Sequence, residues 1–255
     1  MLRHLKKLGY SVKEQVMTTT LLVVAKNEEE GMRVIMPQVR PDWVDQVLVV
    51  DGQSTDGTVA YSRSMGYDVH VQKKPGLRAA YEEAWPHITG DYVITFSPDG
   101  NSPPEFIPQL NAKINEGYDM VIASRYYGDA TSEDDDIITG FGNWLFTNTI
   151  NLLHRGHYSD AMTIYRIYRK ELFYQLGLDR DDTYERFEKL YFTRIGVEPI
   201  LSVRAAKAGL RIADIACPEP PRIGGERKLQ IVRWGLAYMS QVIWEKFTPA
   251  RVLNK

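Results

Sequence analysis

Two polar segments of this sequence carry carboxylates and amides directly after apolar runs. The first, residues 51–58 (DGQSTDGT), follows VLVV and includes the acids Asp51 and Asp56 together with Ser54. Such a segment can be an Asx turn that caps a helix and binds no ligand. A carboxylate in this place, such as Asp51, can also accept a hydrogen bond from the N–H edge of a nucleobase. The segment alone leaves both interpretations open.

The second polar segment, residues 97–105 (SPDGNSPPE), follows the apolar run YVITF. Asp99 and Asn101 are hard oxygen donors two residues apart, an arrangement that suits Mg²⁺ or Mn²⁺ bridged to phosphate oxygens. A Pro-Asp-Gly β-turn ahead of a helix explains the same residues without a metal. Taken by itself, the segment favours neither interpretation.

Several cations occur where an anion could bind. Arg222, Arg227 and Lys228 surround two glycines, and Arg125 directly follows an apolar run. Forked guanidinium groups recognise phosphates, although a solvated basic loop is the simpler interpretation of residues 222–228. The five histidines show no metal-binding spacing, and neither G-x-S-x-G nor GxxxxGK[ST] occurs. A hydrolase triad and a P-loop NTPase are therefore unsupported.

Alternating patterns predict the elements that position these residues. Apolar runs typical of buried strands occur at 18–25, 44–50, 67–71, 91–96 and 120–123, with helical patterns at 58–65, 77–85 and 104–116. This alternation indicates β-α-β units and a parallel sheet with right-handed crossovers. Ligands of such sheets bind beyond the carboxyl ends of the strands. We therefore expect a site built from residues 27–28, 51–56, 97–101 and 124–125.

The pattern loses its regularity after residue 128. Residues 129–136 are acidic and predict a solvated loop or, alternatively, an active-site lid. Helical patterns follow at 137–153, 184–195, 198–209 and 229–247, a strand pattern at 212–217, and a segment of unassigned structure at 158–176. We expect a domain over 18–228, an amphipathic arm at 1–17 and an amphipathic helix and tail at 229–255. Packing on the domain is the favoured interpretation of the arm, and contact with a membrane surface is the alternative.

Composition excludes several classes of protein. The 255 residues are 44% hydrophobic and 25% charged with a formal charge of −2, as in ordinary globular proteins. The single cysteine, Cys217, excludes an internal disulfide and a cysteine-based zinc site, and it fits a reducing cytosol. No apolar run approaches the roughly 20 residues that span a bilayer. Without a basic stripe we expect no nucleic-acid partner, and the oligomeric state is left open.

Taken in order, the segments resemble a family 2 glycosyltransferase of GT-A fold, closest to the polyprenyl-phosphate (dolichol-phosphate) sugar synthases. The resemblance covers residues 18 to 230 and rests on LLVVAKNEEE, VLVVDGQSTDGT, KPGLRAAYEEAW, GDYVITFSPDGNSPPE, VIASRY, SDAMTIYRIYRKEL and PPRIGGERKL. It implies a mostly parallel, twisted α/β sheet flanked by helices. It also implies inverting transfer of a sugar from a nucleotide-diphosphate donor, without a covalent intermediate.

The resemblance assigns the donor site residue by residue. Asn27 and Glu28 match the first nucleotide-binding loop, and Asp51 matches the acid that binds the base, in the segment that includes Ser54 and Asp56. The donor expected from the resemblance is a UDP- or GDP-sugar.

Further assignments concern the metal and the loop over the nucleotide. Gly76 and Arg78 match the loop ahead of a helix that closes over the nucleotide. Asp99 matches the second acid of the metal-binding D-x-D, and Asn101 the place of a further amide ligand, for Mg²⁺ or Mn²⁺. Ser97 replaces the first acid of the motif, and a hydroxyl is a poorer metal ligand than a carboxylate.

The acceptor side is assigned through cations and one acid. Arg125 matches the Ser-Arg-Tyr after the fifth strand, while Arg222, Arg227 and Lys228 match the basic loop that faces the donor diphosphate or the acceptor phosphate. Asp160 occupies the position of an acid close to the acceptor, although the following MTIY departs from the Ser/Thr-Gly-Phe-like turn of the polyprenyl synthases.

The expected reaction is a direct displacement in which metal and arginines stabilise the leaving diphosphate. A lipid phosphate acceptor is already ionised and needs no base, whereas a sugar hydroxyl requires one, for which Asp160 is the candidate. A soluble or polysaccharide acceptor is the alternative within the fold, and a non-catalytic nucleotide-sugar-binding protein is the alternative outside it. We expect a cytoplasmic protein of cell-envelope glycan biosynthesis that contacts a membrane peripherally if its acceptor is a lipid.

Overall fold

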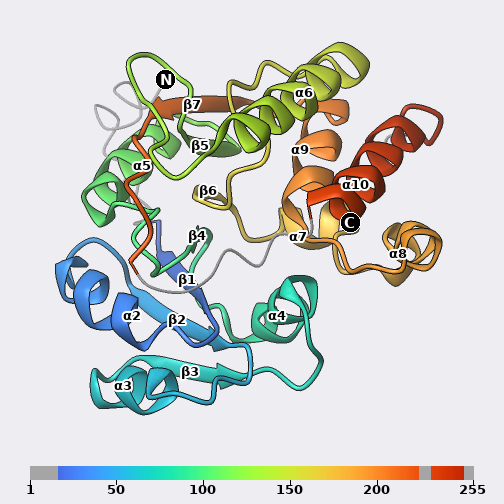
Figure 1. Ribbon diagram of the computed structural model, residues 1–255. Helices are drawn as coiled ribbons and strands as arrows, with labels where there is room; N and C mark the ends of the chain where they lie inside the picture. Colours follow the sequence, from blue (N-terminus) through green and yellow to red (C-terminus); the bar gives the residue numbers. More distant parts are fainter. Residues whose placement is uncertain (1–16, 224–230, 250–255) are drawn as a thin grey trace, which may run out of the picture.

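The computed structural model describes residues 17–223 and 231–249, and they form one seven-stranded sheet with helices on both faces (Figure 1). The strands are β1 (Thr19–Ala25), β2 (Gln46–Asp51), β3 (Asp68–Val71), β4 (Tyr92–Phe96), β5 (Met120–Ser124), β6 (Arg166–Arg169) and β7 (Ile212–Ala216). Their order in the sheet is β3-β2-β1-β4-β6-β5-β7. The predicted α/β class with a mostly parallel sheet is confirmed.

Helices connect and flank the strands. They are α2 (Glu29–Ile35), α3 (Thr58–Ser64), α4 (Leu77–Ala84), α5 (Ile107–Ile114), α6 (Ile137–His154), α7 (Leu172–Gln175), α8 (Glu185–Tyr191), α9 (Glu198–Lys207) and α10 (Ile231–Glu245). Short 3₁₀ turns lie at η1 (Met36–Gln38), η2 (Trp85–His87), η3 (Pro104–Phe106) and η4 (Asp181–Thr183). The helix predicted at 184–195 ends early, because Phe192 adopts a left-handed conformation with φ 51°.

The one antiparallel strand among the described residues is β6, which lies between β4 and β5 and runs opposite to both. It falls in the segment that the sequence left unassigned. Only four residues long, β6 has arginines at both ends, so its sequence lacks the apolar run that marks the other central strands. All other strand pairs of the sheet are parallel.

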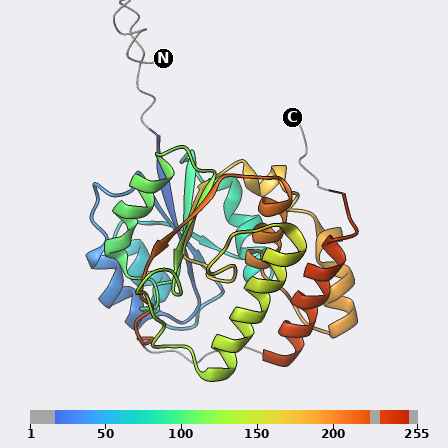
Figure 2. The same ribbon diagram turned by 90° about the horizontal axis from the view of Figure 1, so that it is seen from above.

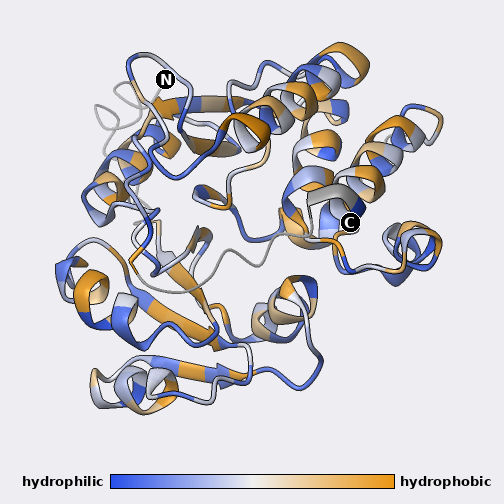
Figure 3. Cartoon of the chain, in the orientation of Figure 1, coloured by the Kyte–Doolittle hydropathy of each residue, from blue (hydrophilic) through white to orange (hydrophobic). Residues whose placement is uncertain are grey.

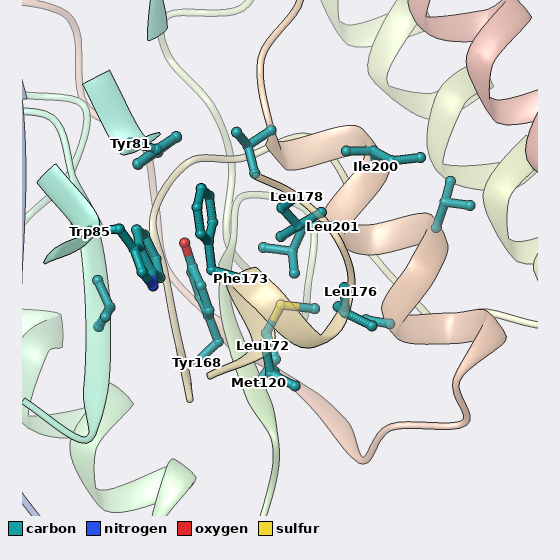
Figure 4. Packing of buried hydrophobic residues seen from close by; sticks show 14 of the residues in the cluster. Tyr81, Trp85, Met120, Tyr168, Leu172, Phe173, Leu176, Leu178, Ile200 and Leu201 are labelled. Atoms are coloured by element: carbon teal, nitrogen blue, oxygen red, sulfur yellow. The ribbon is translucent and has the colours of Figure 1, made fainter. Parts of the chain in front are cut away.

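Both faces of the sheet are buried, which explains why its central strands are apolar without alternation. In β1 the side chain of Leu22 packs into the core on one face, while Leu21 and Val23 pack into the core on the other. Strands β1 and β2 are accordingly mainly hydrophobic in Figure 3. The first core includes Trp85, whose ring stacks on Phe173 at 4.1 Å between centroids (Figure 4).

The C-terminal helices form a separate group at one end of the sheet. Helix α10 packs against α6, α8 and α9, and α6 and α10 lie side by side (Figure 2). One buried and one partly buried ion pair join α9 to α10: Glu245 accepts from Arg204 at 2.8 Å and from Lys207 at 2.9 Å. The predicted boundary at 17/18 lies one residue inside the described part of the chain and the boundary at 228/229 lies outside it, and the division of the chain stays a prediction. None of the helices described is long and apolar enough to cross a membrane.

Candidate active site

The loops that follow β1 and β2 are joined by hydrogen bonds into one surface. Asn27 adopts a left-handed conformation (φ 54°), which asparagine tolerates better than most residues. Its backbone N–H donates to Ser54 Oγ at 2.8 Å, and its side-chain oxygen accepts from the Thr55 N–H at 2.8 Å. The Glu28 N–H donates to Thr58 Oγ1 at 3.0 Å. The structure therefore brings the predicted residues of these two loops together.

Asp51 lies at the end of β2 and has no exposed surface. Its Oδ2 accepts from the Ser54 N–H at 2.9 Å, while its Oδ1 is buried and accepts no hydrogen bond from the described residues. A buried carboxylate oxygen without a partner is costly, and a ligand N–H would remove that cost. Because Oδ1 is enclosed by protein atoms, a nucleobase can reach it only if the residues that cover it move, and the predicted contact with the base stays a prediction.

Asp56, by contrast, is satisfied within the protein. Its carboxylate accepts from the Thr58 hydroxyl at 2.5 Å, the Thr58 N–H at 3.0 Å and the Glu29 N–H at 3.2 Å. Burial works to raise the pKa of Asp56, but these hydrogen bonds outweigh burial and hold the pKa below its ordinary value. Asp56 fixes the starts of α2 and α3.

Arg78 is also used within the protein. It pairs with Glu82 at 2.5 Å, Asp181 at 2.7 Å and Glu188 at 3.6 Å, and its guanidinium lies over the Tyr184 ring. Gly76, with φ 109°, starts the turn into α4, as a glycine can. Its neighbour Leu77, but not Arg78, lines the main cavity described next. In this conformation the Arg78 guanidinium is already paired with acids, so it is not available for the predicted contact with the nucleotide.

A cavity of about 430 Å³ lies between the carboxyl edge of the sheet and helices α6, α9 and α10, and we call it the main cavity because Asp99, Asn101, Arg125 and Arg222 line it. Polar side chains gather at the sheet edge: Ser97, Asp99, Asn101, Arg125, Glu219 and Arg222. Apolar side chains come from the helices and the turn before β6: Ile138, Phe146, Met162, Ile164, Pro199 and Trp234. The cavity thus offers an ionic region and a mainly apolar wall.

Asp99 and Asn101 form the part of the ionic region that could hold a metal. Asp99 Oδ2 pairs with Arg222 at 2.8 Å, and Asp99 Oδ1 accepts from the Asn101 N–H at 3.2 Å. The Asn101 Oδ1 is buried without a hydrogen bond to any described residue, so it is a free hard-oxygen donor. No cluster of three or more His, Cys, Asp or Glu side chains suited to a metal occurs in the described part of the chain. The pair fits a cation that takes its remaining ligands from a diphosphate and water.

Arg125 is held by Asp160 in a two-pronged ion pair. Its Nε lies 2.6 Å from Asp160 Oδ2, and its Nη2 lies 3.1 Å from Asp160 Oδ1. Its Nη1 lies 3.3 Å from Glu219 and 3.4 Å from Asp135. Burial disfavours the charge on Arg125, but these acids outweigh burial and raise its pKa well above the ordinary value. Arg125 stays a fixed cation at the cavity edge.

Asp160 has no exposed surface and also accepts from the N–H groups of Met162 and Thr163, each at 3.2 Å. Burial works to raise its pKa, but Arg125 outweighs burial and holds the pKa below its ordinary value. A general base needs a pKa near the working pH and access to the proton that it takes. In this conformation Asp160 meets neither condition, and the geometry favours a role in positioning Arg125.

Three acids at the site were not singled out in the sequence: Glu219, Asp134 and Asp135. Glu219 follows β7 and accepts from Ser132, while Asp134 lies 3.5 Å from Arg222. Burial raises the pKa of Glu219. The acidic loop of residues 129–136 therefore lies against the cavity, as its lid interpretation requires. For Asp134 and Asp135 the signal in the sequence was the charge of this loop, and nothing in the sequence analysis pointed to Glu219.

Arg222 is at the cavity as predicted. Arg227 and Lys228, predicted from the same basic loop, lie outside the described residues.

The fold is that of a GT-A glycosyltransferase, and comparison with known proteins gives the family. Residues 20–177 match the glycosyl transferase family 2 domain, and the chain belongs to this family. It is 28% identical over 219 residues to a dolichyl-phosphate hexose transferase of Haloferax volcanii, covering 85% of this chain and 89% of the relative. It is 27% identical over 217 residues to the glycosyltransferase AglJ of the same organism, covering 84% and 67%.

Among solved structures, the chain is similar to glucosyl-3-phosphoglycerate synthase from Mycobacterium tuberculosis. Its complex with Mn²⁺, UDP and glucosyl-3-phosphoglycerate aligns with a TM-score of 0.60 and 19% identity, over 91% of this chain and 80% of that one. This likeness shows the shared fold. Together with the family match, it identifies an enzyme, a family 2 glycosyltransferase, so the non-catalytic alternative is set aside.

Proposed function

We propose that this enzyme transfers a hexose from a UDP- or GDP-sugar to the phosphate of a polyprenyl-type lipid, with inversion. The observation that carries the proposal is the cavity, which joins the ionic region of Arg125 and Arg222 to an apolar wall from α6 and α10. The dolichyl-phosphate hexose transferase among its relatives supports the lipid acceptor. The UDP and Mn²⁺ bound by the structural relative support the donor.

The donor nucleotide binds at the loops after β1 and β2. The residues that cover Asp51 Oδ1 move aside so that this oxygen accepts from the N–H edge of the base, and the loop of Asn27 and Glu28 packs beside the nucleoside. Asp99 and Asn101 would hold Mg²⁺ or Mn²⁺, and that cation would supply positive charge to stabilise the leaving diphosphate. Arg222, freed from Asp99, takes an anionic oxygen of that diphosphate. Arg227 and Lys228 are assigned to the same anion on the basis of the sequence.

The acceptor phosphate binds at Arg125, and Asp160 holds this arginine in place. A phosphate monoester is ionised at neutral pH, so its oxygen attacks the anomeric carbon without a general base. The bond from that carbon to the diphosphate breaks as the new bond to the lipid phosphate forms. A hydroxyl acceptor would need a base, and the buried, paired Asp160 is poorly suited to that role.

Helix α6 supports a lipid acceptor through its exposed apolar side chains. Ile137 is 92% exposed and Phe141 61% exposed, and Phe141 stacks on Trp144 with 5.8 Å between ring centroids. On the same helix, Ile138 and Phe146 line the cavity, so the apolar surface continues into it. Contiguous exposed apolar surface is typical of membrane or protein contact. We therefore assign peripheral membrane contact to α6, in addition to the terminal segments predicted from the sequence.

The test is transfer of radiolabelled hexose from UDP-glucose, UDP-galactose or GDP-mannose to polyprenyl phosphate in vesicles. The matched control acceptor is the polyprenol, which has the same chain but no phosphate. We expect product with the phosphate and Mg²⁺ or Mn²⁺, and none with the polyprenol. Equal transfer to the polyprenol or to a soluble sugar, with no preference for the lipid phosphate, would overturn the acceptor assignment.

A further inference from the structure

A buried acid, Glu198, faces the main cavity without a role in the site described so far. It begins α9, is 8% exposed and lines the cavity among mainly apolar side chains. It forms no ion pair with any of the described residues. A carboxylate this buried and without a cation is costly unless other groups donate hydrogen bonds to it.

The protein satisfies only one of its two oxygens. Oε1 accepts from the Tyr81 hydroxyl at 2.8 Å, and Oε2 accepts no hydrogen bond from the described part of the chain. Unlike Asp51 Oδ1, Oε2 is not enclosed by protein atoms, so a ligand in the cavity can reach it.

The surroundings of Oε2 add a hydrogen-bond donor and an aromatic wall. A Cβ at Gly196 would lie 2.7 Å from Glu198 Oε2 and 3.2 Å from the Tyr238 hydroxyl, so both groups lie at this glycine. The Tyr238 hydroxyl accepts from the Gly196 N–H at 2.6 Å, which leaves its own proton to donate. Trp234, one turn earlier on α10, lines the same cavity.

An acid in the first turn of a helix is common, because it interacts favourably with the helix dipole. That explanation accounts for an exposed acid at the end of a helix. It does not account for a buried acid that faces a cavity beside a free tyrosine proton and an indole ring.

Glu198, Tyr238 and Trp234 together offer the hydrogen-bonding groups and the aromatic ring that bind a sugar. Glu198 Oε2 needs a hydrogen-bond donor and the Tyr238 hydroxyl needs an acceptor, and a sugar hydroxyl can be both. The C–H faces of a sugar ring also pack on aromatic rings. The ionic region at the sheet edge binds the diphosphate, so the hexose attached to it extends into the same cavity. Building on the proposed function, we propose that Glu198 and Tyr238 bind hydroxyl groups of the transferred hexose, with Trp234 beside its ring.

The experiment compares binding of each nucleotide sugar with binding of its free nucleotide by titration calorimetry on the full chain. The probes are UDP, UDP-glucose, UDP-galactose, GDP and GDP-mannose with Mn²⁺. We expect one nucleotide sugar to bind the wild type more tightly than its nucleotide. In Glu198→Gln its affinity falls about 10-fold, the usual scale for a hydrogen bond to a charged group, while the affinity for the free nucleotide changes less than about 2-fold.

Matched variants separate this effect from misfolding. Glu116→Gln makes the same chemical change at an exposed acid outside the cavity and leaves both affinities unchanged. Tyr238→Phe removes only the hydroxyl and lowers the affinity for the nucleotide sugar alone. Deoxy analogues of the preferred sugar identify the sugar hydroxyl that Glu198 binds. The analogue that lacks this hydroxyl should bind Glu198→Gln and the wild type with equal affinity.

The outcomes are distinct for the two proposals. Equal losses of nucleotide and nucleotide-sugar affinity in Glu198→Gln, or no loss of either, would overturn the hexose assignment alone. A wild type that binds neither UDP- nor GDP-based probes would overturn the proposed function, and the hexose assignment with it.

Discussion

Arg125 and Asp160 act as one unit in this structure. Their two short contacts fix the guanidinium plane at the cavity edge, and Asp160 has no surface of its own there. A single charge change on Asp160 therefore tests whether it positions an arginine or removes a proton.

We expect Asp160→Asn to lower kcat/KM for polyprenyl phosphate about 10- to 100-fold, because an amide cannot hold the guanidinium with two charged contacts. If Asp160 only positions Arg125, the pH profile of the remaining activity keeps its shape in the variant. If Asp160 is the general base, the variant profile lacks one ionisation. The measurement is kcat/KM against pH for both proteins. Full activity of Asp160→Asn would contradict the importance of the pair.

The same pair makes a prediction for stability. The pKa of Asp160 is lowered from 3.8 in the folded protein, so its charged form is stabilised by folding. Its contribution to the free energy of unfolding is present above the unfolded pKa and is lost as pH falls through the folded pKa. The stability difference between wild type and Asp160→Asn, from urea unfolding, should be constant above about pH 5 and shrink at lower pH. A difference that grows on acidification would contradict this sign.

Asp51 makes a prediction for nucleotide binding. In Asp51→Asn the amide oxygen must stay on the Ser54 N–H, so the amide NH₂ replaces Oδ1 and faces the base as a donor. We expect UDP or GDP affinity to fall by about 10-fold or more in titration calorimetry. Asp56→Asn is the control, since Asp56 is satisfied by Thr58 and Glu29, and it should lower Tm with little effect on nucleotide affinity.

At the scale of elements, α6 combines two surfaces on one helix. Thr147 and Ile150 pack inward, Ile138 and Phe146 line the cavity, and Phe141 is exposed. Half of its residues are hydrophobic, and the sequence by itself does not tell which of them are covered. The structure shows that much of that surface is left uncovered by the described residues.

Replacement of Phe141 and Trp144 by serine should weaken vesicle binding about 10-fold or more, because each aromatic side chain transferred from water contributes about 1.5–3 kcal/mol. Sedimentation with polyprenyl-phosphate vesicles measures this binding. Leu190→Ser, at an exposed apolar residue on α8, is the control. Unchanged sedimentation of the double variant would remove α6 from the membrane contact.

Helices α9 and α10 are joined through Glu245, which lies between Arg204 and Lys207. Glu245→Gln leaves the buried Arg204 and the partly buried Lys207 without a charged partner, for a loss of about 3–5 kcal/mol in unfolding free energy. Thermal denaturation should show a clear decrease in Tm, and Glu116→Gln, at an exposed pair, should not. Since α10 also carries Trp234 and Tyr238, nucleotide-sugar binding should fall as well.

At the scale of the whole molecule, much of the fold followed from the sequence because burial on both faces gives each central parallel strand a continuous apolar run. Strands β1, β2, β4 and β5 were predicted in this way, with the polar loops at their carboxyl ends. The strand β6 was missed, because four residues with an arginine at each end carry no such run. Its place between β4 and β5 depends on contacts distant in sequence.

The sequence by itself determined the family, the α/β class and the loops that bear Asn27, Asp51, Asp99 and Arg125, because these depend on local pattern and on ordered motifs. Only the tertiary structure decided how their charges pair. It placed Arg125 on Asp160, Arg222 on Asp99, and Arg78 away from the cavity on Asp181. Pairing is set by side chains that approach through space from separate elements, so no spacing along the chain encodes it. For the same reason Glu198, a lone acid at the start of a helix, gained a candidate role only when α4, α9 and α10 closed around it.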